Sequence, residues 1–181
     1  RVHFPAGTYV IDRGVVAADG HAVDFPSNFL VTGEGEGRSI ILQTGVSGVG
    51  GAVEFGCLGV VDGTSSVTIQ GLHFKGENGV GATNFEYVFN NQASAIDIRL
   101  TTTKDITVRD CYFDNLWGFS VHDRGSDNLR TNVMNCKMRY CANGLNVCAR
   151  NSIQYGNQFF HSEGIEIVGV GAMVINNTFD D

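Results

Sequence analysis

The sequence predicts an all-β protein, built as a parallel β-solenoid of about six coils with little or no helix. Three observations predict this fold. An eight-residue phrase occurs five times, a shorter strand-like phrase lies between its copies, and no stretch carries apolar residues at the 3.6-residue period of a helix. The composition agrees, because 24 glycines and only 2 prolines suit short strands joined by tight turns.

The longer phrase reads apolar–x–Val–x–Asp/Asn–Cys–x–apolar. It is clearest in ITVRDCYF (residues 106–113) and TNVMNCKM (residues 131–138), and related forms are VTIQGLHF, IQYGNQFF and AMVINNTF. From residue 108 onward the copies follow one another every 19 to 25 residues. A unit of that size cannot bury its own apolar face, so we expect the units to stack in register. The expected interior column is Phe74, Phe113, Met138, Phe160 and Phe179, and the expected turn column is Asp110, Asn135, Asn157 and Asn176.

The shorter phrase reads small–apolar–polar–apolar and predicts a strand with one buried face. Its copies are AIDI, GFSV, GLNV and GIEI, beginning at residues 95, 118, 144 and 164. Stacking these copies predicts an outward column of Asp97, Ser120, Asn146 and Glu166. Two residues further along each strand, the predicted outward column is Arg99, His122, Cys148 and Val168.

Three segments resemble successive coils of the right-handed parallel β-helix of the pectate-lyase superfamily. They are VHFPAGTYVI (residues 2–11), FLVTGEGEGRSIIL (residues 29–42) and SVTIQGLHFKG (residues 66–76). The resemblance implies one β-helix domain over residues 1–181, as a segment of a longer and trimeric protein. The superfamily holds polysaccharide lyases, glycoside hydrolases, alginate epimerases and phage tailspikes, so it implies a carbohydrate-active protein that binds and depolymerises a polysaccharide. The implied location is extracellular, either secreted or on a virion tail.

In such a solenoid the outer face of one sheet would hold the sugar polymer. The candidate catalytic residues on that face are Asp97, Arg99, His122, Asp123 and Arg124. Ser120, Asn146 and Glu166 are candidate substrate-binding residues beside them. An insertion over residues 75–94 precedes this group, and its Phe85 and Tyr87 could stack on sugar rings or simply anchor the loop; Trp117 is a further stacking candidate.

Two mechanisms are compatible with these residues. Hydrolysis needs two carboxyl groups about 5–9.5 Å apart, which Asp97 and Asp123 on neighbouring coils could supply and Asp97 and Glu166, three coils apart, could not. β-Elimination needs a base at the sugar C5 and a group that neutralises the uronate carboxylate. Arg99, His122 and Arg124 could serve in these roles, with Asp97 or Asp123 holding Ca²⁺. Each of these residues also has a plain structural interpretation, above all Asp97 with Arg99 as a surface ion pair. The alternative function is a non-catalytic structural or receptor-binding solenoid.

Net charge, hydropathy and cysteine spacing argue against a nucleic-acid-binding protein, a membrane-spanning protein and a zinc protein. The net charge is −7 with no basic block, which argues against nucleic-acid binding, and no run of 18 apolar residues exists to span a membrane. The five cysteines include no CxxC pair, so a zinc site is not expected and no metal ligand is assigned. Cys111 and Cys136 are expected to stack as free thiols.

Overall fold

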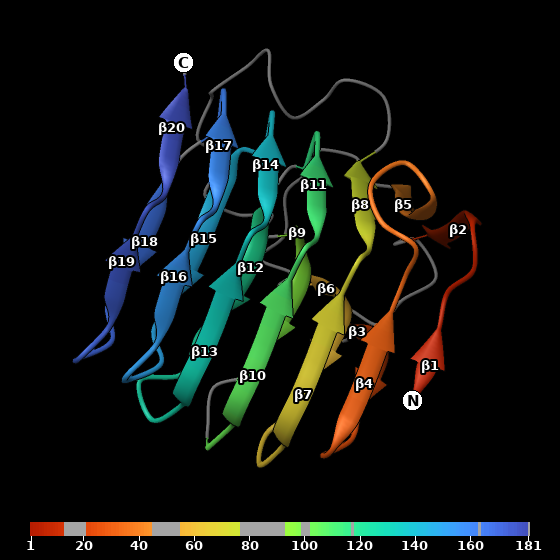
Figure 1. Cartoon of the computed structure of the whole chain (residues 1–181). Helices are drawn as coiled ribbons and strands as arrows, with labels where there is room; N and C mark the ends of the chain where they lie inside the picture. Colours follow the sequence, from red (N-terminus) through yellow and green to blue (C-terminus); the bar gives the residue numbers. More distant parts are fainter. Residues whose placement is uncertain are drawn as a thin grey trace.

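The computed structural model describes residues 1–12, 21–44, 55–76, 93–98, 102–116, 118–162 and 164–180. These residues form twenty strands and no helix, arranged in three parallel sheets that wind around one core (Figure 1). The expected all-β parallel solenoid is confirmed. No helix in this part of the chain is long and apolar enough to cross a membrane.

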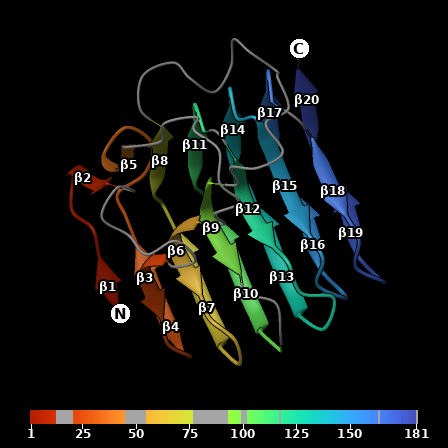
Figure 2. The same ribbon diagram turned by 180° about the vertical axis from the view of Figure 1, so that it is seen from behind.

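Each coil contributes one strand to each sheet in turn, so strands that pair side by side are three elements apart in the chain. The sheets carry the labels A, B and C below. Sheet A contains β1 (Val2–His3), β4 (Phe29–Thr32), β7 (Ser65–Gln70), β10 (Lys104–Arg109), β13 (Leu129–Met134), β16 (Ile153–Tyr155) and β19 (Met173–Ile175). Sheet B contains β2 (Gly7–Asp12), β5 (Ser39–Thr44), β8 (His73–Gly76), β11 (Tyr112–Asp114), β14 (Lys137–Arg139), β17 (Gln158–Phe160) and β20 (Thr178–Asp180). Sheet C contains β3 (His21–Phe25), β6 (Phe55–Val60), β9 (Ala93–Ile98), β12 (Phe119–Asp123), β15 (Asn143–Val147) and β18 (Ile165–Ile167), and is seen from behind in Figure 2.

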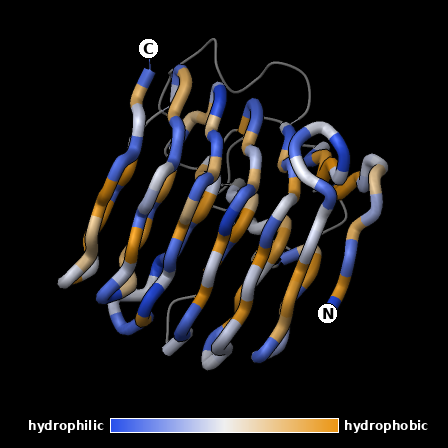
Figure 3. The backbone as a smooth tube through the Cα atoms, in the orientation of Figure 1, coloured by the Kyte–Doolittle hydropathy of each residue, from blue (hydrophilic) through white to orange (hydrophobic). Residues whose placement is uncertain are grey.

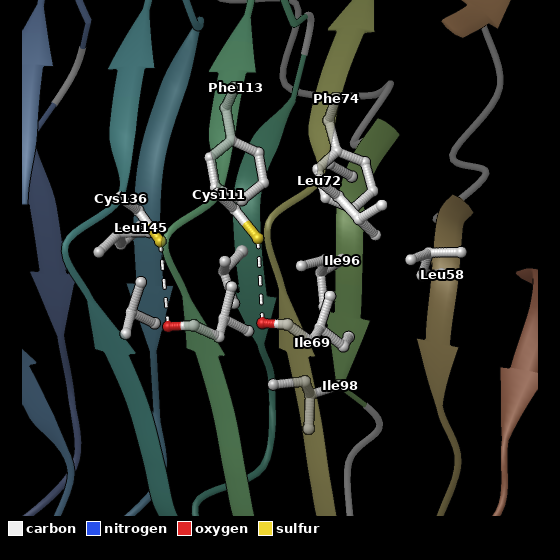
Figure 4. Packing of buried hydrophobic residues seen from close by; sticks show 14 of the residues in the cluster. Leu58, Ile69, Leu72, Phe74, Ile96, Ile98, Cys111, Phe113, Cys136 and Leu145 are labelled. Carbon is white, nitrogen blue, oxygen red and sulfur yellow. Dashed lines mark hydrogen bonds between the residues drawn. The ribbon is translucent and has the colours of Figure 1, made fainter. Parts of the chain in front are cut away.

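The strands alternate apolar and polar residues because one face of each sheet packs on the shared interior (Figure 3). The core is a set of columns in which equivalent side chains of successive coils touch. Phe74 and Phe113 lie side by side in Figure 4, and their stacked rings have centroids 5.2 Å apart. The register places Met138 next in the column. In-register parallel pairing therefore explains why the eight-residue phrase recurs.

The expected register is wrong by one residue for one copy of the phrase, IQYGNQFF (residues 153–160). Met138 pairs with Phe159, which is fully buried and stacks on Phe179 at 4.8 Å, whereas Phe160 lies on the other face. A one-residue slip moves every side chain of a strand to the opposite face, and two consecutive phenylalanines concealed that slip in the sequence. The interior column therefore contains Phe159 in place of Phe160.

The same slip affects the turn column. The corner between sheets A and B is made by one left-handed residue per coil, namely Gly71, Asp110, Asn135, Gly156 and Asn176, with φ between 53° and 67°. Asn157 follows this corner and is buried instead. Its Oδ1 accepts from the Cys136 N–H at 2.9 Å and its Nδ2 donates to the Val133 carbonyl at 2.9 Å, so it joins neighbouring coils.

All five cysteines lie among the described residues and none of them forms a disulfide, as expected for Cys111 and Cys136. Cys111 and Cys136 occupy equivalent buried positions on adjacent coils, and each thiol points toward a backbone carbonyl of the coil before it (Figure 4). Burial raises the pKa of the Cys136 thiol well above its ordinary value. These cysteines act as small apolar core residues.

Candidate functional site

The register of sheet C brings Asp97, His122, Asn146 and Glu166 into one column across β9, β12, β15 and β18. The sequence predicts Ser120 as the neighbour of Asp97 in this column, but His122 occupies that position on β12. The error is a shift of two residues, which keeps the same face of the strand and so cannot be detected by alternation alone. Ser120 is instead fully buried, beside the Cys141 thiol, whose pKa burial raises to about 11.

Asp97 is the centre of a buried ionic network. Arg124 holds it with two hydrogen bonds, Nε to Oδ1 and Nη2 to Oδ2, each 2.7 Å long. His21 Nε2 also lies 2.7 Å from Asp97 Oδ2, and His21 Nδ1 contacts Asp24 Oδ1. The Asp97 side chain is 0% exposed and that of His21 is 1% exposed. The network, here called the Asp97 network, joins β3, β9 and the residue that follows β12.

Sequence reasoning missed His21 and Asp24. They stand 76 and 73 positions before Asp97, and β6 lies between their strand and β9 in the sheet. His21 can reach Asp97 because β6 carries glycine at the crossing points. A Cβ added to Gly59 would lie 1.8 Å from His21 Nδ1, and one added to Gly56 would lie 2.9 Å from His21 Cδ2.

Gly59→Ala should therefore destabilise the protein. The methyl group would have to displace the His21 ring from its contact with Asp97, and overpacking of this kind costs about 1–3 kcal/mol. Thermal or urea unfolding measures the change. Gly7→Ala is the matched control, because a Cβ there meets nothing closer than 3.9 Å. Equal effects at the two glycines would contradict the crossing of His21 over β6.

His122 lies beside this network on the next coil. Its side chain is 9% exposed, its ring stacks on Phe119 with centroids 4.3 Å apart, and its Nδ1 is 3.8 Å from Asp97 Oδ1. Burial lowers the pKa of His122 below its ordinary value, although the nearby carboxylates of Asp97 and Glu166 oppose this effect. His122 is thus mainly neutral at pH 7 and able to accept a proton.

Asn146 and Glu166 complete the column. Asn146 Nδ2 donates to Glu166 Oε2, and the Cys148 thiol lies 3.4 Å from Asn146 Oδ1. Asp97 and Glu166 are three coils apart, or about 14 Å at 4.8 Å per coil. That separation exceeds the 5–9.5 Å required of a hydrolytic carboxyl pair. Asn146 and Glu166 offer hydrogen-bonding groups toward the end of the column.

Asp123 does not share the outer face with Asp97. It pairs with the core residues Ile98 and Val147, is fully buried, and accepts hydrogen bonds at Oδ1 from Asn128 Nδ2 and from the Gly125 N–H. Asn128 in turn receives the Thr103 N–H of the preceding coil. Asp123 thus organises the turn between β12 and β13, and an Asp97–Asp123 catalytic pair does not fit this geometry.

Asp123→Asn should leave any activity intact and improve stability at neutral pH. Burial raises the pKa of Asp123, which means that the folded state binds more protons than the unfolded state. Stability then falls as pH rises from the unfolded value, about 3.9, through the raised folded value, and asparagine removes that loss. We expect the variant to melt above wild type at pH 7, with the difference disappearing near pH 3. A lower melting temperature at pH 7 would contradict this role.

Several predicted residues lie outside the described part of the chain. They are Arg99, Phe85, Tyr87 and Trp117, together with residues 77–92 of the predicted insertion. Within the described ranges, no group of three or more His, Cys, Asp or Glu side chains is placed to hold a metal ion.

Comparison with known proteins adds information on the fold. No family model matches the sequence, and the comparison with curated proteins gives no match. Among solved structures, the fold is similar to that of a protein from Parabacteroides merdae named a "putative glycosyl hydrolase", with a TM-score of 0.63. The match covers 98% of this chain and 81% of that chain at 12% sequence identity, so it is a likeness of fold.

Proposed function

We propose that this protein binds a polysaccharide along the outer face of sheet C and cleaves it, with His122 as the group that moves a proton. The observation that carries the proposal is His122 itself. It is a nearly buried histidine with a lowered pKa, seated among a carboxylate, an arginine and a line of polar side chains. A solvated surface histidine would show neither the burial nor the shift. The name of the P. merdae protein supports a carbohydrate-active function.

The Asp97 network would orient this centre. Both Asp97 oxygens accept hydrogen bonds from Arg124, so Asp97 is poorly suited to act as a nucleophile or general acid. Its suitable role is to hold Arg124 beside His122. Both His21 nitrogens lie against carboxylate oxygens, Nδ1 against Asp24 and Nε2 against Asp97, which fixes the orientation of the ring. Asn146 and Glu166 would hydrogen-bond sugar hydroxyl groups further along the column.

The geometry favours β-elimination over two-carboxylate hydrolysis, because Asp97, Asp123 and Glu166 form no pair with suitable spacing and orientation. In an elimination, His122 Nε2 would take the proton from C5 of a uronate. The electron pair left behind forms the C4–C5 double bond as the C4–O bond breaks, and the departing oxygen takes a proton from solvent water. Arg124, which Asp97 holds by two hydrogen bonds, would be the cation that stabilises the uronate carboxylate.

A second candidate function is adhesion without cleavage, in a receptor-binding or structural solenoid. The Asp97 network is also compatible with this function, because a buried carboxylate in contact with three basic side chains links neighbouring strands of sheet C without taking part in chemistry. In that case the outer face of sheet C would bind glycans with the same side chains and leave them intact.

Incubation with soluble polysaccharides tests the proposal. Polygalacturonate and alginate serve as acidic substrates and hydroxyethyl cellulose as a neutral one. The absorbance of unsaturated ends in the ultraviolet detects elimination, and reducing-end assays detect cleavage of either kind. We expect unsaturated products from an acidic polymer. Reducing ends without ultraviolet absorbance would contradict elimination, and binding without either signal would favour adhesion.

A further inference from the structure

A second group of side chains lies where sheet B turns into sheet C. The residue after each of β11, β14 and β17 takes the left-handed conformation, with φ of 58° at Asn115, 52° at Tyr140 and 45° at His161. The backbone N–H of each donates to a carbonyl of the next coil, which fixes the conformation. The corner therefore demands positive φ at one equivalent position on three coils.

Tyrosine is an unfavourable choice for this position. A left-handed backbone suits glycine and asparagine, as at Asn115, and it is strained for a bulky side chain. Strained residues that the surrounding structure holds in place cluster at functional sites. The presence of two aromatic rings where asparagine would be relaxed suggests that the rings themselves are used.

The rings form an ordered and accessible surface. Tyr140 and His161 stack with centroids 5.3 Å apart and planes only 1° from parallel. Tyr140 is 38% exposed, and His161 is exposed as well. The Arg139 guanidinium lies 5.6 Å from the ring centroids of both Tyr112 and Tyr140, and it is paired with Asp114. This group of Tyr112, Arg139, Tyr140 and His161 is the aromatic ledge, whose one cation is neutralised by a neighbouring carboxylate.

The aromatic ledge shares its coils with the proposed site. Tyr140 comes shortly before β15, which carries Asn146, and His161 comes shortly before β18, which carries Glu166. The ledge therefore lies at the corner from which β15 and β18 of the proposed site begin. Sugar rings combine apolar C–H faces with a polar rim, and a phenol beside an imidazole offers the complementary mixture of apolar carbon and hydrogen-bonding groups.

We propose that the aromatic ledge is an additional carbohydrate-binding site, at which Tyr140 and His161 contact an uncharged face of a sugar in the bound polysaccharide. This inference rests on the proposed function of sheet C. The ledge would strengthen binding of the polysaccharide and would take no part in the chemical step.

The test measures binding in a His122→Ala background, so that the polymer is not cleaved. Affinity electrophoresis in gels containing polygalacturonate or hydroxyethyl cellulose gives apparent dissociation constants. We expect Tyr140→Asn and His161→Asn each to weaken binding of at least one polymer by about fivefold or more. Their melting temperatures should equal or exceed that of the parent, because asparagine relieves the strain. Tyr155→Asn, on β16 of sheet A, removes an equally exposed tyrosine (42%) away from the ledge and should bind as the parent does.

Unchanged binding in both asparagine variants would contradict a binding role for the ledge. So would a loss of binding accompanied by a lower melting temperature, or a parent protein that neither polymer retards. Cleavage by the protein with His122 intact is measured separately. Normal cleavage with an inert ledge would refute this inference alone, whereas absence of cleavage would count against the proposed function.

Discussion

Replacing His122 by alanine is expected to lower the rate of polysaccharide cleavage about 10²–10⁴-fold, the usual contribution of a positioned general acid or base. Folding should change little, since the Asp97 carboxylate keeps its hydrogen bonds to Arg124 and its contact with His21. The measurement is the initial rate on an acidic polymer, with melting temperature recorded alongside. His3→Ala is the control, because His3 lies on sheet A and its side chain is 42% exposed. A rate within threefold of wild type, an order-of-magnitude allowance for indirect effects, would remove His122 from the mechanism.

The pH profile gives an independent reading of the same residue. A base must be unprotonated to act, and burial lowers the pKa of His122 from 6.5. The acid limb of kcat/KM should therefore fall below pH 6.5, with full activity at pH 7. Removing the carboxylate charge with Asp97→Asn should move that limb to still lower pH, because Asp97 raises the pKa of His122. A limb above pH 6.5 would point to a different base.

Asp97→Ala is expected to be the most destabilising single substitution on this face. It leaves Arg124 and His21 buried without their carboxylate partner, and breaking a buried ion pair in this way costs about 3–5 kcal/mol. Chemical unfolding at pH 7 measures the loss. The same loss should appear at high salt, since buried pairs are poorly screened.

Asp105→Asn is the matched control. Asp105 also receives two hydrogen bonds from an arginine, Arg130, but both side chains are 46% exposed. An exposed pair contributes little and is screened by salt, so the control should unfold close to wild type. If Asp97→Ala and Asp105→Asn cost the same, Asp97 does not organise a buried network.

The fold could be predicted from the sequence because a parallel stack makes each coil repeat the same side chain at the same height. The register confirms this for the clearest copy of the phrase, where Val108 pairs with Val133 and Phe113 pairs with Phe74. The misalignments at Phe160 and Ser120 share one physical cause. Neighbouring residues of similar character let a strand slide by one or two positions without changing its apparent pattern, and only backbone pairing decides the register.

The candidate site was less accessible to sequence reasoning. Asp97, His122 and Arg124 do come together, because they lie on adjacent coils of one sheet. His21 and Asp24 could not be found, since their contact with this group depends on a side chain crossing a glycine-bearing strand. The expectation for Asp123 is wrong because its inward position is polar, and the following turn donates hydrogen bonds to its Oδ1 there.

The most direct test of the account is a crystal structure of the His122→Ala variant with an oligosaccharide of the polymer that the wild type cleaves. We expect a sugar on the outer face of sheet C, with a hydroxyl or carboxylate oxygen within about 3.2 Å of Asn146, Glu166 or Arg124 and a C5 atom facing the vacated His122 position. Oligosaccharide bound on sheet A or sheet B alone, with the outer face of sheet C empty, would contradict it.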